Sequence, residues 1–416
     1  MKKIQDIFKG DKVIWVIFFF LCIISLIEVF SAASTLAYKD GSFWMPLIKQ
    51  ATFLGVGTLI VIGIHNVPCR FFKIIPILLL IPTYLVLLFT TLYGAMTNGA
   101  ARWLMIAGIQ FQPSEIGKGV TIITAALILA QMQRDDGADR KAFKYILWLA
   151  GIMCALIFPE NLSTAVLLFG VVIVMMFIGR VSLKQLGTLL GVILLFAAIG
   201  ATIMLRLPDD PHSKVYDVPG FHRLSTWKSR FESHGGSTKT LDPKDFDIDK
   251  DAQIAHAHIA IATSNVVGKM PGNSVERDFL SQAFSDFIFA IIIEEMGLWG
   301  AALVVFLYIV LLFRTGRIAS RCEHNFPAFL AMGLALLLVA QAVLNMLVAV
   351  GIFPVTGQPL PLISRGGTST LINCVYIGMI LSVSRYAHKR AEKAGDVEPL
   401  DEPDVNPEYY DTKNLI

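Results

Sequence analysis

Charged residues are scarce in this sequence. Asp, Glu, Lys and Arg make up 16% of its 416 residues, whereas hydrophobic residues make up 55%. A soluble chain of this length would need far more charged surface, so the composition excludes a soluble globular protein. Apolar runs of about 20 residues recur from end to end, which is the length needed to cross about 30 Å of hydrocarbon. Because backbone polar groups must be satisfied inside a bilayer, the sequence predicts an all-α, polytopic membrane protein.

Other signatures are missing as well. The five cysteines show no paired spacing, and none lies in the long polar segment, which argues against a disulfide framework or a metal site. There is no Walker loop and no dinucleotide fingerprint, so nucleotide hydrolysis is not indicated, and no nucleic-acid partner is expected. The first apolar run, 13–34, ends in SAAS as a signal peptide might end, but it is too long and many spans follow, so we interpret it as the first helix.

About ten transmembrane helices are predicted, at 13–33, 47–65, 74–94, 114–132, 143–159, 163–179, 184–205, 286–313, 326–352 and 368–385. With ten crossings, alternate loops share a side, and the side that holds both termini has 19 Lys and Arg residues if the long loop is left out. These are Lys2, Lys3, Lys9, Lys12, Arg70, Lys73, Arg134, Arg140, Lys141, Lys144, Arg180, Lys184, Arg314, Arg317, Arg321, Arg385, Lys389, Arg390 and Lys393. The short loops of the other side have only three, Lys39, Arg102 and Arg365. The positive-inside rule therefore predicts that both termini are cytoplasmic.

The predicted organisation has three parts. A cytoplasmic N-terminus, 1–12, precedes a transmembrane domain over 13–390, whose large outer loop, 206–285, joins helices 7 and 8. The remaining segment, 391–416, is acidic and lacks apolar periodicity, which predicts a disordered cytoplasmic tail.

One part of the outer loop has a helical pattern. Residues 251–264 place Ile254, His258 and Ile261 on one face. The pattern is typical either of an amphipathic helix at the outer membrane surface or of a helix packed within the loop, and the sequence leaves both open.

The stretch 279–297 joins the long polar segment to an apolar run, and Asp286 lies at the junction. Asp286 or Ser285 could simply cap the helix that follows. If its surroundings are apolar, the pKa of Asp286 rises and the side chain becomes a better general base. Glu294 and Glu295 are predicted to lie roughly 12 Å deeper and to satisfy polar groups between helices.

Lys118 is a second unusual charge, about one turn into an apolar run. Pro113 and Ser114 just before it are a helix start signal, with Ser able to cap. Glu115 is three residues before Lys118 on the same helical face and could pair with it. Two interpretations stay open, a polar role in a substrate cavity and a plain ion pair. Arg102 and Trp103 precede this helix at the membrane interface.

A third unusual stretch opens the last span. It contains Ser364, Arg365, Gly366, Gly367 and Thr368. Glycines let backbone N–H groups approach a ligand closely, and an arginine can bind a phosphate through two hydrogen bonds, which favours anion binding over a plain turn and helix cap.

Gln341 and Asn345 lie four residues apart within the preceding span. They share one helical face, which predicts hydrogen bonds to a neighbouring helix.

Taken together, these stretches resemble the SEDS family (shape, elongation, division and sporulation proteins). The family pattern appears as NGAARW, FQPSEIGK, FSDFIFAIIIEEMG and GIFPVTGQPLPLISRGGTST, in the family's order and over about 13–390. The resemblance implies a peptidoglycan glycosyltransferase that polymerises lipid II into glycan strands at the outer face of the bacterial cytoplasmic membrane. The wording of the last motif is more similar to the division-type member than to the elongation-type member.

The resemblance also implies roles for individual residues. Asp286 takes the place of the family's essential aspartate, and Lys118 with Arg102 and Trp103 matches its cavity residues. Several positions depart from the family pattern, namely Ser281, Gln282, Phe284, Arg365 and Asn161. At Gln282 and Phe284 the departure removes a Glu and a His, which leaves Asp286 the only titratable candidate in that segment.

The implied chemistry needs one base. An undecaprenyl diphosphate leaving group is already acidic, so it does not require the second carboxylate that glycosidases use. Asp286 would take the proton from the acceptor hydroxyl, while Arg102, Lys118 and Arg365, with or without a divalent cation such as Mg²⁺ or Mn²⁺, would stabilise the diphosphate.

Two other functions compete with this one, a lipid II flippase and a membrane scaffold for division partners. A flippase predicts inverted repeats, and we see no convincing repeat. A scaffold leaves Lys118 and Arg365 without a role. The resemblance further implies a class B penicillin-binding protein transpeptidase as partner, other division proteins, and a location at the division septum.

Overall fold

A helix occupies each of the ten predicted spans. The structure is a computed structural model that describes residues 8–32, 44–93, 95–97, 100–106, 109–159, 161–206, 248–280 and 283–393. The ten helices are α2 (Lys12–Ala32), α4 (Met45–His65), α5 (Ile75–Tyr93), α6 (Pro113–Gln131), α7 (Arg140–Ile157), α8 (Leu162–Ile178), α9 (Leu183–Arg206), α12 (Ile288–Ser320), α13 (Asn325–Ala349) and α14 (Thr368–Lys393). A polytopic α-helical architecture is therefore confirmed.

Eight of these helices are long and apolar enough to cross a membrane. For α5 the crossing segment includes the short 3-10 helix η1 (Cys69–Ile74). The shorter α8 is also apolar, and α7 has cationic residues, Arg140, Lys141 and Lys144, in its first turns. The exact number of crossings thus stays a prediction.

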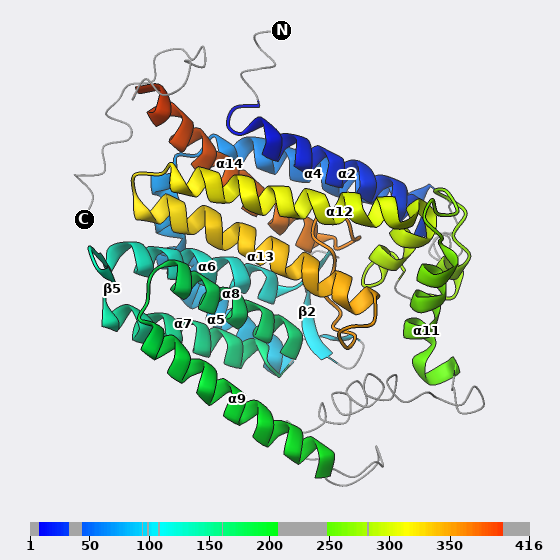
Figure 1. Cartoon of the computed structure of the whole chain (residues 1–416), viewed down its shortest axis with the longest axis horizontal. Helices are drawn as coiled ribbons and strands as arrows, with labels where there is room; N and C mark the ends of the chain where they lie inside the picture. The colour runs from blue at the N-terminus through cyan, green and yellow to red at the C-terminus, as the bar shows by residue number, and fades with distance from the viewer. Residues whose placement is uncertain are drawn as a thin grey trace.

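The two ends of the bundle differ. The start of α2 and the end of α14 lie at the same end as the small hairpin of β4 (Gln133–Arg134) and β5 (Gly137–Ala138), whereas the loop helix α11 (Ile248–Thr263) lies at the other end (Figure 1). Asp11 holds the first of these ends together, because its backbone N–H donates to Ser384 Oγ at 2.9 Å and its carboxylate pairs with Arg314. This arrangement agrees with the predicted topology, in which that end is cytoplasmic.

The core of the bundle is centred on α13, which packs on α6, α12 and α14, and α14 also packs closely on α4. In contrast, α9 lies at the edge of the bundle beside α8, and Gln185 near its start donates to the Arg140 carbonyl of α7 at 3.3 Å (Figure 1). Its side chains, among them Leu194, Leu195 and Phe196, are exposed. Such apolar surface is what a lipid-facing helix presents.

A small antiparallel sheet precedes α6, where the sequence analysis predicted no strand. It has the order β1 (Ala95–Thr97), β2 (Ala100–Ile106), β3 (Ile109–Phe111). Leu104 pairs with Phe111 and Ile106 with Ile109. The sheet satisfies the backbone of this segment and fixes the entry into α6.

The predicted depth of Glu294 and Glu295 is wrong. Helix α12 is interrupted at Gly297 (φ 66°), where the loop backbone lies across it: Lys269 N–H donates to Glu294 O at 2.9 Å and Met270 N–H to Glu295 O at 2.8 Å. Both side chains are buried. Glu294 pairs with the Lys269 ammonium of the loop at 2.6 Å. Glu295 accepts from Ser31, which lies at the C-terminal end of α2. The predicted role, satisfying polar groups between helices, holds for Glu295, which accepts from Ser31 of α2, whereas the partners of Glu294, such as Lys269, lie in the loop.

The loop helix α11 packs against α12 and α13, which supports the packed-helix interpretation. Its buried positions are Ala257 and Ala260, whereas Ile254 is half-buried and His258 is exposed. The predicted face was therefore wrong by about one residue, because the alanines allow the close approach that larger side chains would prevent.

Parts of two other predictions lie outside the described residues. Helix α14 runs to Lys393, so the first three residues of the predicted tail are helical and the rest is not described. The outer loop is described from Ile248 onward, apart from residues 281 and 282.

Candidate functional site

The three unusual stretches of the sequence meet in one polar network. Its centre is α13, whose Gln341 and Asn345 are buried and lie one turn apart. Gln341 connects α13 to Lys118, and Asn345 connects it to Asp286. Both amides also bind the 354–368 segment that precedes α14, so residues far apart in the sequence form one site towards the end of the bundle that the predicted topology places outside.

Lys118 is fully buried within α6 and has two partners. Its ammonium lies 2.8 Å from Glu115 Oε1 and donates to Gln341 Oε1 at 2.8 Å. The predicted pair with Glu115 is confirmed. A buried charge needs such compensation, since removal from water costs several kcal/mol per ion.

The backbone around Asp286 is held from two sides. Asn345 Nδ2 donates to the Asp286 carbonyl at 2.9 Å and to the Gln358 carbonyl at 2.8 Å. Ser364 Oγ donates to the Ser285 carbonyl at 2.6 Å, and Arg365 N–H donates to the Phe284 carbonyl at 3.0 Å. The segment before α12 is thereby fixed against the segment before α14.

The side chain of Asp286 does not cap α12. The N-cap position is Phe287, and no side chain caps it, so the capping interpretation was wrong. The half-buried Asp286 carboxylate instead accepts from Ser285 Oγ at 3.0 Å.

The start of α6 shows a similar difference. Pro113 occupies the first helical position as predicted, but the N-cap is Gln112, without a side-chain cap. Ser114 accepts a hydrogen bond from Gln112 Nε2 at 3.0 Å. Its predicted capping role is therefore wrong.

The stretch that opens α14 combines a cation with a tight turn. The Arg365 guanidinium lies 5.7 Å from the centroid of the Phe284 ring, and Gly367 has a positive φ of 52°. Thr368 Oγ1 donates to the Gln110 carbonyl at 3.2 Å, which ties this stretch to β3. Gly366 is half-buried, like Arg365 and Thr368. Arg102 and Trp103 lie in β2, but their side chains are outside the described part of the chain.

Two further residues belong to this network and were missed. Gln358 Nε2 donates to Thr164 Oγ1 at 2.6 Å, and both side chains are buried. This contact brings α8 into the site, where Asn161 caps the helix by accepting from Thr164 N–H at 3.1 Å. A polar amide between prolines in PVTGQPLP was the available signal for Gln358.

An apolar groove of about 480 Å³ runs between α8 and α13 beside the network. One end of the groove is lined by Leu162, Ser163 and Thr356. These residues are one or two positions from Thr164 and Gln358, whose side chains are hydrogen-bonded to each other. From there it follows α13 from Leu347 to Leu336, roughly 16 Å along the helix axis. Its open, apolar shape suits a hydrocarbon chain.

Within the described ranges, no three His, Cys, Asp or Glu side chains are grouped so that they could hold a metal ion. Glu115 and the Glu294–Glu295 pair are already engaged by cations or hydrogen-bond donors. The residues described therefore do not form a ready-made protein cage for a divalent cation.

Comparisons with known proteins agree with this architecture. The family model described as the FtsW, RodA and SpoVE cell cycle protein matches residues 11–389. The chain is 30% identical to the probable peptidoglycan glycosyltransferase FtsW of Nitrosococcus halophilus, with 85% of this chain and 87% of the relative covered. It is 29% identical to the stage V sporulation protein E of Bacillus subtilis, with 91% and 97% covered.

Solved structures show the same fold. A chain from a peptidoglycan synthase complex that coordinates polymerization and crosslinking matches with a TM-score of 0.70 and 22% identity, covering 91% of this chain and 99% of that one. The rod shape determining protein RodA of Thermus thermophilus matches with a TM-score of 0.60 and 21% identity, covering 90% and 97%. This multi-pass membrane protein therefore belongs to the FtsW, RodA and SpoVE family of cell cycle proteins.

Proposed function

We propose that this chain is a division-type peptidoglycan glycosyltransferase that polymerises lipid II at the outer face of the cytoplasmic membrane, with Asp286 as its general base. The observation that carries the proposal is the single polar network that joins Asp286, Lys118 and the Arg365 stretch at one end of the bundle. Relatives that bear the name FtsW, peptidoglycan glycosyltransferase, support the division type over the elongation type.

The proposed reaction transfers a sugar from a diphosphate to a hydroxyl. The acceptor's 4-hydroxyl attacks the anomeric carbon as its proton passes to the Asp286 carboxylate, and the bond to the diphosphate breaks with inversion. Negative charge then grows on the diphosphate oxygens. The cations of Lys118, Arg365 and Arg102 would stabilise that charge, with Trp103 and the backbone of Gly366, Gly367 and Thr368 completing the substrate contacts.

The geometry around Asp286 suits this role. Its backbone is fixed through Asn345 and, at the residue before it, through Ser364, so the carboxylate has a defined position. A preorganised base avoids the reorganisation that a mobile one would need during reaction. The half-buried position reduces competition from bulk water.

The neighbouring groove supports a lipid-linked substrate. Lipid II carries a polyprenyl chain, and the groove between α8 and α13 offers an apolar surface that begins beside the polar network. A substrate with a polar head and a long apolar tail needs both features side by side.

A divalent cation, if used, would be held mainly by the diphosphate, because Mg²⁺ commonly binds one or two carboxylates together with substrate phosphates. No step of the proposed reaction is assigned to such a cation.

We further propose that the chain acts at the division septum with a class B penicillin-binding protein transpeptidase and other division proteins. The support is that one structural relative is a chain of a peptidoglycan synthase complex that coordinates polymerization and crosslinking.

The test is strand synthesis from labelled lipid II by the purified protein with its cognate transpeptidase, whose own chemistry is blocked. Asp286→Asn should abolish polymer while leaving the fold intact. The matched control is Asp278→Asn, since the Asp278 side chain is 56% exposed and lies in the short 3-10 helix η2 (Glu276–Asp278). Polymer from Asp286→Asn at the wild-type rate would refute the assignment of the base.

The same preparation separates the other functions. A wild-type protein that makes no polymer but moves labelled lipid II across vesicle membranes would favour a flippase. A protein that does neither yet binds its division partners would favour a scaffold.

A further inference from the structure

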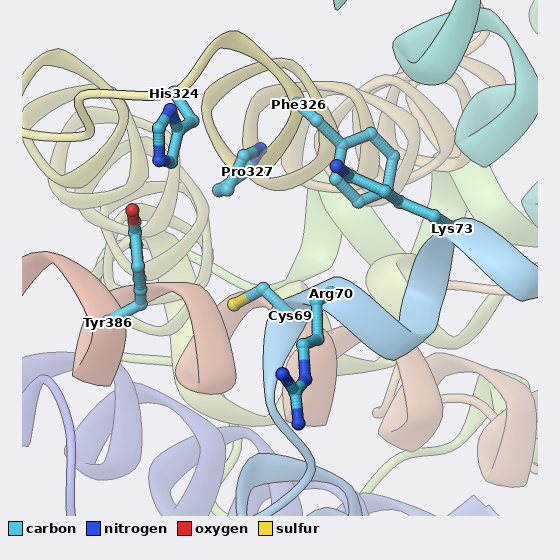
Figure 2. Close-up of a pocket in the computed structure, with 7 residues that line it drawn as sticks. All are labelled: Cys69, Arg70, Lys73, His324, Phe326, Pro327 and Tyr386. Atoms are coloured by element: carbon cyan, nitrogen blue, oxygen red, sulfur yellow. The ribbon is translucent and has the colours of Figure 1, made fainter. Parts of the chain in front are cut away.

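A small pocket lies at the end of the bundle opposite the proposed active site. It is formed by η1, by the start of α13 and by α14, and its volume is about 40 Å³. Figure 2 shows its lining, with Cys69, Arg70 and Lys73 on η1, His324, Phe326 and Pro327 at the start of α13, and Tyr386 on α14. By the predicted topology this end is cytoplasmic.

The polar groups of this pocket are mostly hydrogen-bond donors. Arg70 and Lys73 carry positive charge, and His324 and Tyr386 can each donate a further hydrogen bond. No carboxylate is found among the described residues that line it, and the neighbouring acid, Glu323, is exposed. Such a set of groups matches a phosphate, which accepts hydrogen bonds and carries negative charge.

The lining side chains are held in place by their neighbours. The Lys73 ammonium lies 5.7 Å from the centroid of the Phe326 ring. The rings of His324 and Tyr386 stack with their centroids 6.3 Å apart, and they lie next to each other on the side of the pocket away from Lys73 (Figure 2). Side chains that are already ordered lose less entropy when a ligand binds.

The surroundings indicate the kind of molecule that carries the phosphate. A cavity of this size admits a phosphate group and not a sugar or a base, so the rest of the ligand must lie outside. Lys73 stands at the start of the membrane-crossing segment Cys69–Leu92. One and two turns further, Ile77 and Ile81 are 76% and 66% exposed, which gives an apolar surface for acyl chains directly below the cations.

We propose that this pocket binds the phosphate of an anionic phospholipid in the cytoplasmic leaflet, with Lys73, His324 and Tyr386 as donors and with Arg70, whose guanidinium is turned away from His324 and Tyr386 (Figure 2), as a second positive charge at its edge. Basic pockets between helices at the cytoplasmic side are suited to anionic head groups. The bound lipid would join η1, α13 and α14, and α13 also carries Gln341 and Asn345 of the polar network nearer the other end. The proposal goes beyond the glycosyltransferase function and does not depend on it.

The experiment measures lipid binding by the purified full-length protein with native mass spectrometry. Phosphatidylglycerol, zwitterionic phosphatidylcholine and inorganic phosphate are the three probes. The wild type should retain phosphatidylglycerol over phosphatidylcholine, and inorganic phosphate should compete only weakly because it lacks acyl chains. The double variant Arg70→Gln/Lys73→Gln should bind phosphatidylglycerol roughly tenfold more weakly or worse.

Two further variants keep the test specific. Lys144→Gln/Lys184→Gln removes the same charge from exposed positions near the starts of α7 and α9 and should leave binding unchanged. The exchange Arg70→Lys/Lys73→Arg conserves charge and should retain most of the affinity, which separates loss of binding from loss of folding. Equal retention of both lipids by the wild type, an equal loss in the Lys144 and Lys184 variant, or full displacement by inorganic phosphate would overturn the proposal.

Discussion

The buried Lys118 allows a test that separates structure from catalysis. Lys118→Met removes the ammonium and leaves Glu115, which is 1% exposed, without its cation. Breaking a buried ion pair in this way costs about 3–5 kcal/mol of unfolding free energy. Glu115→Gln alone should also be destabilising, because it leaves the buried ammonium without a counter-charge and with only uncharged amide oxygens as acceptors.

The double variant Glu115→Gln/Lys118→Met should be more stable than either single variant. It leaves no buried charge, and only uncharged amide groups, at position 115 and at Gln341, lose the ammonium as a donor, at a cost of about 1–3 kcal/mol each. The unfolding free energies are measured by denaturant titration in mixed micelles, as a double-mutant cycle. A double variant whose loss equals the sum of the two single losses would refute the argument that the pair is a closed, buried unit.

Polymer synthesis from lipid II is measured on the same four proteins at a temperature where all are folded. If Lys118 stabilises the departing diphosphate, the double variant should recover stability but not activity. If the pair is only structural, activity should recover together with stability. The cycle therefore decides between the two interpretations that the sequence left open.

Three further predictions follow from the contacts. Asn345→Leu should lower the unfolding free energy by about 1–3 kcal/mol for each of the two carbonyls, those of Asp286 and Gln358, that lose their donor. Polymer synthesis by the folded fraction should also fall, because the Asp286 backbone is no longer held. Gly268→Ala should destabilise the pairing of the loop with α12 by at least about 1–2 kcal/mol, because the residue has φ +81° and an added Cβ would lie 2.3 Å from the Glu295 carbonyl oxygen. Limited proteolysis of the loop measures this effect. Gly200→Ala is the control, because its added Cβ would meet nothing within 4 Å. The His258 side chain is exposed on one side, but its ring lies against Gly351 just after the end of α13, and this partial desolvation lowers its pKa. The unfolded form of α11 therefore binds a proton more readily than the packed form. The packing of α11 should therefore be complete at neutral pH and weaken as pH falls below the ordinary histidine pKa of about 6.5, seen as faster amide exchange in α11, and His258→Gln should remove this dependence.

The helices and the motif residues could be predicted because their signals are local. An apolar run of about 20 residues predicts a membrane helix from the cost of burying polar groups alone. The Glu115–Lys118 pair follows from a spacing of three residues on one helix. The interhelical hydrogen bond of Gln341 followed in the same way, from two amides on one face of an apolar helix, whereas Asn345 binds backbone carbonyls in two segments outside the helices.

Capping and depth could not be predicted reliably, because they depend on where a helix begins or is interrupted. Ser285, Asp286 and Ser114 all stand near helix starts, yet neither helix is capped by a side chain. The depth of Glu294 and Glu295 was counted along a continuous helix, whereas a loop about 25 residues earlier lies across α12 at Gly297.

The partners of the site residues are decided by tertiary packing. Lys118 meets a side chain 223 residues away, Asp286 is held by one 59 residues away, and Gln358 by one 194 residues away. No hydropathy pattern or local spacing contains these distances, because each depends on which helix faces which within the bundle. The residue types that can carry the chemistry are readable along the chain, and their assembly into one network arises only when α6, α8, α12, α13 and α14 pack together and the buried polar groups must find partners.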